Sequence, residues 1–247
     1  MYVMRGRVRY SEVDTRGTLT IAALINYLQD SCSFDSEDEG VGLPYLQENG
    51  WGWYITNWMI ELNSLPQMGD EIAVATWVYA YRGMFAYRNF LLTDANDVPL
   101  VRANAIWLLM DIRNSYPVRI PKVIIDARDT EPPIEREWGD RKIALAADFE
   151  EKNSVTVAPL HLDTNFHMNN EHYIEIARDV LPKGEKIYEI ATEYKKAALL
   201  GDVLHVRRAK KDARTWQVIL TGKRQNEIFA IVDFVTEMRK DRYVKAL

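Results

Sequence analysis

The chain has 247 residues, of which 47% are hydrophobic and 27% are charged, so it can form one large core or two cores of roughly 100–150 residues each. The net charge of -5 argues against a nucleic-acid-binding protein, because phosphate contacts require a basic surface. No run approaches the roughly 20 apolar residues that span a bilayer, and the first residues lack the apolar segment of a signal peptide. We therefore expect a cytoplasmic protein with no membrane association.

The first predicted elements are a strand that enters a turn, over residues 7–17, and an amphipathic helix from about Ile21 to Phe34. Thr20 is the expected N-cap of this helix. Apolar residues at helical spacing line one face of it: Ile21, Leu24, Ile25 and Leu28. Cys32, the only cysteine, continues this series, so we expect a buried core thiol and no catalytic nucleophile, disulfide or multi-cysteine metal site.

Three strands and a connecting segment follow in the chain. Alternation of apolar and polar residues predicts strands at about 71–81, 85–93 and 99–111. The stretch 121–150 holds three prolines among many charged residues and shows little periodicity. It is interpreted as a linker between an N-terminal domain, residues 1–120, and a C-terminal domain, residues 151–247.

The second half repeats the order of the first half. A strand at 154–162 enters a turn at Asp163, and a helix from about Asn170 to Val180 follows. Gly201-Asp202 matches Gly69-Asp70, and each pair opens a run of strands, here at about 203–209, 215–222 and 227–238. Each half therefore reads as an α+β unit in which one long helix lies across a curved antiparallel sheet.

The tryptophans are concentrated in the first domain. Large aromatic residues usually form core, but they can also form a wide apolar wall for a long ligand. Three of them are the candidates for substrate binding: Trp51, Trp53 and Trp58.

The chemistry-bearing residues gather where the second strand meets the second helix: Asp163, Asn165, His167, Asn169 and Asn170. The first turn of a helix has unpaired N–H groups and a positive dipole end, which stabilise a developing oxyanion. A carboxylate can activate water there, and an imidazole can exchange protons near neutral pH. This combination suits hydrolysis of an activated carbonyl compound.

Two other readings of these residues stay open. Asp, Thr and Asn are also the residues that build Asx turns and N-caps at strand-to-helix junctions. Three ligands can make an open zinc site, so His161, Asp163 and His167 are a conceivable metal set, although their spacing matches no standard metal motif. We expect neither a metal nor a cofactor.

The stretch Asp163-Thr-Asn165-Phe-His167-Met-Asn169-Asn170, followed by Tyr173 and Ile174, resembles the signature of acyl-ACP thioesterases. Two other segments are similar to that family: Val101 to Asp111, followed by Arg119-Ile-Pro121, and Glu193-Tyr-Lys-Lys196, followed by Gly201-Asp202. The resemblance implies two tandem hotdog domains, with the acyl chain held largely by the first. It also implies catalytic roles for Asp163, Asn165 and His167 in the second domain.

The chain departs from the family at one place. Many of these enzymes carry a glutamate after the two basic residues that match Lys195 and Lys196, and the plant enzymes carry a Glu-Cys pair there, but this chain has Ala197-Ala198. A cysteine nucleophile is therefore excluded, and the second carboxylate is missing or supplied elsewhere. Glu193, on one face of a predicted strand with residues 195 and 197, and Glu171, four residues after His167 on the helix, are candidates to support the site, with Asn169. For either glutamate taken singly, a structural salt bridge is the favoured role.

The implied activity is hydrolysis of a fatty acyl-ACP thioester to a free fatty acid by a water-based mechanism. An acyl-CoA thioesterase and a non-catalytic acyl-binding protein are the alternatives. The expected partner is acyl carrier protein with its phosphopantetheine-linked chain, and the chain is expected to be a monomer or a homodimer.

The densest basic run is expected at a hairpin turn, either solvated or as a docking patch: Arg207, Arg208, Lys210, Lys211 and Arg214. Asp14 takes the place of Asp163 in the first repeat, and we expect it to be a turn residue only.

Overall fold

The computed structural model describes residues 1–224 and 226–236. The chain divides into two compact units, residues 1–139 and residues 140 onward, so the division falls inside the stretch predicted as a linker. Part of that stretch is ordered on the first unit, where α3 (Lys122–Asp126) buries Ile124 and the Trp77 indole donates to the Pro132 carbonyl. Among the described residues, none of the helices is long and apolar enough to cross a lipid bilayer.

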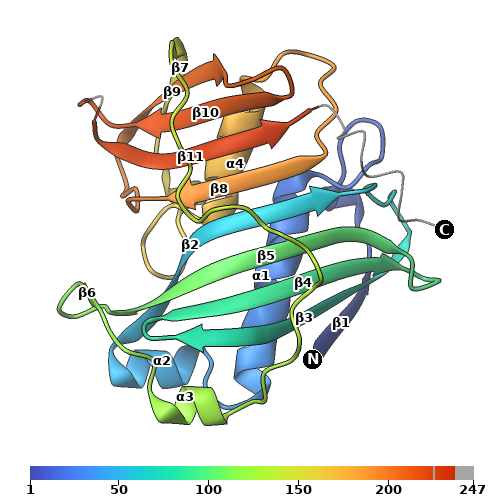
Figure 1. The fold of residues 1–247 in the computed structure, drawn as a ribbon, viewed down its shortest axis with the longest axis vertical. Helices are drawn as coiled ribbons and strands as arrows, with labels where there is room; N and C mark the ends of the chain where they lie inside the picture. Colours follow the sequence, from blue (N-terminus) through green and yellow to red (C-terminus); the bar gives the residue numbers. More distant parts are fainter. Residues whose placement is uncertain (225, 237–247) are drawn as a thin grey trace. The chain divides into compact units, whose positions relative to one another are not determined.

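The first unit is an antiparallel sheet with a long helix packed on it (Figure 1). The strand order is β1-β3-β4-β5-β2, and the short β6 pairs with β5. The strands are β1 (Tyr2–Arg7), β2 (Trp51–Leu62), β3 (Glu71–Arg82), β4 (Phe85–Asp94), β5 (Pro99–Asp111) and β6 (Tyr116–Pro117). Helix α1 (Ile21–Asp38) packs against β3 and β1, and the shorter α2 (Leu43–Asn49) packs against β2.

Helix α1 forms where the apolar spacing predicts it. The Thr20 hydroxyl accepts a hydrogen bond from the Ala23 amide at 3.1 Å, which confirms the predicted N-cap. Cys32 is buried, as predicted, and burial raises the pKa of its thiol to about 11. The helix extends beyond the predicted end at Phe34 to Asp38. The apolar pattern does not reveal this last turn, because the residue that it buries is Asp35, which is ion-paired.

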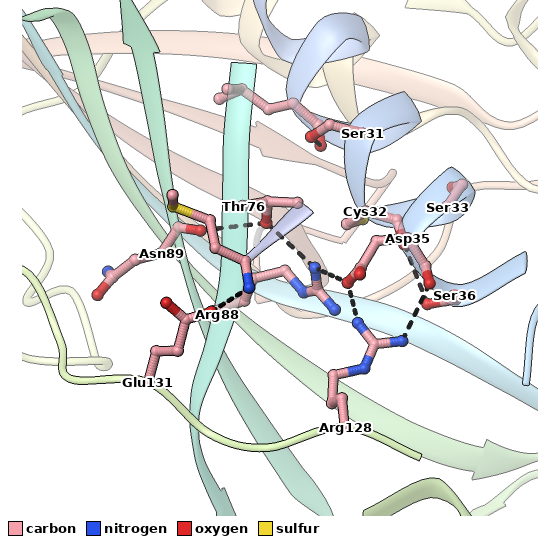
Figure 2. Close-up of polar contacts among 12 residues, drawn as sticks. Ser31, Cys32, Ser33, Asp35, Ser36, Thr76, Arg88, Asn89, Arg128 and Glu131 are labelled. Carbon is pink, nitrogen blue, oxygen red and sulfur yellow. Dashed lines mark hydrogen bonds and ion pairs between the residues drawn. The ribbon is translucent and has the colours of Figure 1, made fainter. Parts of the chain in front are cut away.

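The buried Asp35 carboxylate ties α1 to the sheet and to the segment after α3. Figure 2 shows it between two guanidinium groups: Arg88 donates from Nη1 at 2.6 Å, and Arg128 donates from its own Nη1. Arg88 also donates to the Thr76 hydroxyl at 3.1 Å. Burial lowers the pKa of both arginines. The cluster therefore places one carboxylate between two cations, of which Arg88 is buried and Arg128 is partly buried.

The second unit has the same plan. Its strands are β7 (Glu150–Thr156), β8 (Glu189–Tyr194), β9 (Val203–Lys210), β10 (Thr215–Thr221) and β11 (Ile228–Val235), and its helix is α4 (Asn170–Asp179). The antiparallel order β8-β11-β10-β9-β7 repeats the order β2-β5-β4-β3-β1 of the first unit, and α4 packs against β10 and β11. The predicted α+β class and the two tandem hotdog domains are confirmed. Residues 237 and 238 of the last predicted strand lie outside the described residues.

Three predictions about strands are wrong in detail. Strand β1 ends at Arg7 and β7 ends at Thr156, and in each unit a single 3-10 turn follows in place of the predicted strand. Strand β8 ends at Tyr194, so residues 195 and 197 do not continue its face. Strand β2 was not predicted, because most of its second half is buried on both faces and shows no alternation.

Candidate active site

The turn at residues 163–167 is closed by its own backbone and by the Asp163 carboxylate. The Asp163 amide donates to the His167 carbonyl at 2.8 Å. Oxygen Oδ1 of Asp163 accepts from the amides of Asn165 at 2.8 Å and of His167 at 3.2 Å. Asp163 therefore does build an Asx turn, and this role leaves its second oxygen, Oδ2, without a hydrogen bond in the described part of the chain.

The structure brings Asp163, Asn165 and His167 together on this one turn, and each is half-buried. The turn leads directly into α4, whose N-cap is Asn169: its Oδ1 accepts from the Glu171 amide at 3.5 Å. The carboxylate, the amide and the imidazole therefore lie next to the N-terminal end of a helix, where backbone N–H groups and the dipole favour negative charge.

The first unit contains the same turn without the same side chains. Oxygen Oδ1 of Asp14 accepts from the amides of Arg16 at 2.9 Å and Thr18 at 3.1 Å, and the Asp14 amide donates to the Thr18 carbonyl at 2.8 Å. Arg16 also forms an ion pair with this carboxylate and lowers its pKa. The prediction that Asp14 is a turn residue agrees with this geometry, and Arg16 and Thr18 stand where Asn165 and His167 stand in the second unit.

Glu171, a predicted supporting residue, is buried at the start of α4. Its Oε1 lies 3.0 Å from Nδ1 of His172, and this hydrogen bond raises the pKa of His172. The ring of His161 lies 5.0 Å from the His172 ring, and burial together with His172 lowers the pKa of His161. Oxygen Oε2 of Glu171 is buried without a hydrogen-bond partner among the described residues.

Glu193, the other carboxylate candidate, has two partners. Its Oε2 accepts from the Ile143 amide and its Oε1 lies 2.9 Å from Nζ of Lys195. These contacts are those of a structural salt bridge that holds the segment before β7 against β8. Any role for Glu193 in chemistry remains a prediction.

Two tyrosines that had no assigned role in the sequence analysis contact the segments next to the turn. The Tyr173 hydroxyl accepts from the Ala198 amide at 2.8 Å, and the Ala198 carbonyl accepts from the Met168 amide at 2.9 Å. The Tyr194 hydroxyl donates to the Asn170 carbonyl at 2.8 Å, and its ring meets Tyr173 edge-on at 5.5 Å. Ala198 is therefore buried beside the candidate turn, at the position where the plant enzymes carry a cysteine. The signal in the sequence for Tyr173 and Tyr194 was their place in the two segments that resemble the family.

The predicted tryptophans lie in two environments of the first unit. Trp58 is fully buried against Phe90, with ring centroids 5.1 Å apart. Trp51 and Trp53 are partly exposed and pack against a buried apolar cluster that includes Leu46 of α2, Ala86 of β4, Leu109 of β5 and Ile124 of α3. Trp58 is a core residue in this structure, and the substrate-binding role of all three stays a prediction.

The conceivable metal set is not assembled by the fold. Among the described residues, the group of three side chains close enough to share an ion is Glu171, His172 and Glu175, and it includes neither Asp163 nor His167.

The basic run is also placed differently from the prediction. Arg207 and Arg208 lie within β9 and not at a turn, and each has a carboxylate within 4.0 Å, Glu151 and Glu150 respectively. Lys211 pairs with Asp233 at 2.6 Å. Three of the five cations in this run are therefore already compensated, which weakens its reading as a docking patch.

The comparisons with known proteins agree with this architecture. The family model for the acyl-ACP thioesterase N-terminal domain matches residues 1–127, and the model for the C-terminal domain matches residues 145–240. The chain is similar to an acyl-[acyl-carrier-protein] hydrolase, FATB3, of Cuphea viscosissima, with 27% identity over 68% of this chain and 43% of that protein. It is also similar to a palmitoyl-acyl carrier protein thioesterase of Gossypium hirsutum, with 24% identity over 87% of this chain and 56% of that protein. The chain thus spans about half the length of the curated relatives it matches.

Two solved structures show the same fold over nearly the whole chain. An acyl-ACP thioesterase from Bacteroides thetaiotaomicron superposes with a TM-score of 0.84 at 23% identity, covering 95% of this chain and 97% of that one. A 12:0-ACP thioesterase from Umbellularia californica gives a TM-score of 0.82 at 18% identity, covering 95% and 96%. With both domain models matched in order along the sequence, the chain belongs to the acyl-ACP thioesterase family.

Proposed function

We propose that the chain hydrolyses a fatty acyl-ACP thioester to a free fatty acid and the carrier thiol, with the chemistry at the turn 163–167. The observation that carries this proposal is the difference between the two repeats. Both units build the same Asx turn around an aspartate, but only the second places an amide and an imidazole on it, as Asn165 and His167. The fold needs the turn in both places, so the extra side chains require another reason.

In the proposed mechanism, Oδ2 of Asp163 accepts a hydrogen bond from the attacking water, while Oδ1 stays fixed by two backbone amides. The water oxygen bonds to the thioester carbon, and one water proton passes to the imidazole of His167. The N–H groups at the start of α4 stabilise the oxyanion, and Asn165 holds the water or the carbonyl. The C–S bond then breaks, and the sulfur leaves as the thiol after it receives a proton from His167.

The carboxylate that relatives carry after the two lysines is absent here. The nearby carboxylates are Glu193 and Glu171, and neither has the contacts to replace it in full. Glu193 is engaged by Lys195 and the Ile143 amide, whereas Glu171 is buried and one of its oxygens has no hydrogen-bond partner among the residues that the structure describes. We therefore propose that Asp163 acts as the only carboxylate in contact with the water, with Glu171 acting through His172 at most. The acyl chain is proposed to lie on the first unit, with Trp51 and Trp53 as the accessible candidates for its apolar wall.

The test is a turnover profile with one acyl group presented on ACP and on CoA, over several chain lengths, with free fatty acid measured by mass spectrometry. We expect hydrolysis with a higher kcat/KM on ACP, and loss of turnover in His167→Ala. Equal efficiency on the two carriers would argue against ACP as the physiological substrate. A wild-type protein that hydrolyses no acyl thioester would overturn the assignment as an enzyme and would favour an acyl-binding protein.

A further inference from the structure

Four large apolar side chains are exposed around the candidate turn. They are Leu160 at 76% exposure, Phe166 at 78%, Leu199 at 50% and Leu200 at 58%, and we call them the apolar collar. Three chain segments carry them, and these segments are hydrogen-bonded to one another. The Met168 amide donates to the Ala198 carbonyl at 2.9 Å, and the Asn169 amide donates to the His161 carbonyl at 2.8 Å. An isolated antiparallel β-bridge joins His167 to Leu199. The collar is therefore one local surface next to Asp163 and His167.

Phe166 is held in a backbone conformation that disfavours it. Its φ is +60°, in the left-handed region that a bulky residue rarely adopts. The matching residue of the first unit is Gly17, with a φ of +76°, and glycine takes this conformation without a steric penalty. An exposed phenylalanine thus occupies a strained position where it has no core to fill, which points to a role in contact with something outside the chain.

Three of the four collar residues have no apolar counterpart in the first repeat. Equivalent contacts in the two units identify the matching positions. The Leu199 amide donates to the Asp202 carboxylate, as the Gln67 amide donates to the Asp70 carboxylate. An isolated β-bridge joins Leu162 to Met168, as another joins Val13 to Leu19. By this match the collar residues correspond to Ser11, Gly17, Gln67 and Met68. Only Met68 is a large apolar residue, so the fold does not require an apolar surface at this turn.

The size of the collar is sufficient for a narrow ligand. Four such side chains expose an area on the order of 400 Å², within the range of the largest apolar patch on a typical monomer, which is often functional. The apolar part of one side of a protein interface has a similar area, so the choice of a narrow ligand rests on the position of the collar beside Asp163 and His167.

We propose that the apolar collar binds the pantetheine arm of the thioester substrate, through its methylene and gem-dimethyl groups. This inference rests on the proposed function: when the thioester carbon lies at Asp163 and His167, the arm beyond the sulfur leaves across the segments that surround the turn. Phe166, Leu199 and Leu160 then contact the arm, and the strain at Phe166 keeps its ring on the surface to do so. The arm is common to acyl-ACP and acyl-CoA, so the collar serves either carrier.

The test replaces the collar by the residues of the first repeat, which are known to be compatible with this turn. The variant is Leu160→Ser/Phe166→Gly/Leu199→Gln, and the matched control is Met68→Ser, an exposed apolar residue in the equivalent place of the other unit. Each protein is assayed with the same acyl group on pantetheine and on N-acetylcysteamine, which keeps the thioester and the nearest amide but lacks the rest of the arm. If the triple variant does not fold by circular dichroism, Phe166→Gly alone replaces it.

We compare kcat/KM for the pantetheine thioester with kcat/KM for the N-acetylcysteamine thioester. In the collar variant we expect this ratio to fall about tenfold, because KM for the pantetheine thioester rises, and in Met68→Ser we expect it to stay at the wild-type value. An unchanged ratio would overturn the proposal, because the collar would then affect only the turn. A loss seen with acyl-ACP but not with acyl-pantetheine or acyl-CoA would also overturn it, since the collar would then contact the carrier protein.

Failure of the proposed function gives a different result. If the wild type hydrolyses neither thioester, equilibrium binding of a non-hydrolysable acyl-pantetheine ketone is measured instead. Binding about tenfold tighter to the wild type than to the collar variant would still support the collar as a pantetheine site, and equal binding would refute it.

Discussion

The buried cluster around Asp35 allows a quantitative prediction for Asp35→Asn. The substitution keeps the shape of the side chain but removes the one negative charge between the guanidinium groups of Arg88 and Arg128. All three side chains are nearly buried, with exposures of 7% for Arg88, 10% for Arg128 and 11% for Asp35, so water cannot replace the lost carboxylate. Removing one partner of a buried ion pair costs about 3–5 kcal/mol of unfolding free energy.

Urea denaturation followed by tryptophan fluorescence measures this loss. Six of the seven tryptophans lie in residues 1–139, so the signal reports mainly on the unit that contains Asp35. The matched control is Asp126→Asn, which breaks the exposed ion pair with Lys122 and should cost less than about 1 kcal/mol. A similar small loss in both variants would refute the reasoning that burial decides the energy of the Asp35 cluster.

Three single side chains outside the candidate turn carry further predictions. Thr20→Ala removes the N-cap of α1 and should lower the unfolding free energy by about 1 kcal/mol in the same assay. Burial raises the pKa of the Cys32 thiol from 9.0 to about 11, so the stability that the neutral thiol contributes is complete below pH 9 and is lost as the pH rises through 11. The difference in unfolding free energy between wild type and Cys32→Ala should therefore shrink between these two pH values. A constant difference would contradict this pKa shift. Glu171→Gln should lower the pKa of His172, followed by NMR titration of the histidine ring, and an unchanged pKa would show that Glu171 does not hold the proton there.

The repeat and most of its elements could be predicted from the sequence because their signals are local. Helical spacing from Ile21 to Leu28 and alternation in β3 and β10 reflect half-buried elements, which leave a periodic pattern. Strand β2 and the end of α1 could not be predicted in this way. Strand β2 is buried on both faces along much of its length, and Asp35 is buried only because two arginines distant in the sequence neutralise it.

The candidate turn could be located from residue types, but its supports could not. Asp163 was open to three readings, as a turn residue, as a metal ligand and as a carboxylate that activates water, and the structure shows that the first role uses only Oδ1. The contacts of Tyr173 with Ala198 and of Tyr194 with Asn170 join residues about 25 positions apart, and no spacing rule connects them. The strain at Phe166 is a property of its backbone angle and leaves no trace in the sequence.

The central claim is that the carboxylate of Asp163 has a chemical role beyond building its turn, and comparison of two matched substitutions tests it most directly. In Asp163→Asn and in Asp14→Asn, the side-chain carbonyl oxygen can still accept the two backbone amides, so both turns keep their geometry while one charge is lost in each. We predict that kcat for an acyl-ACP substrate falls by about 100-fold or more in Asp163→Asn and changes less than about twofold in Asp14→Asn. Equal turnover in the two variants would contradict the assignment of the active site to this turn.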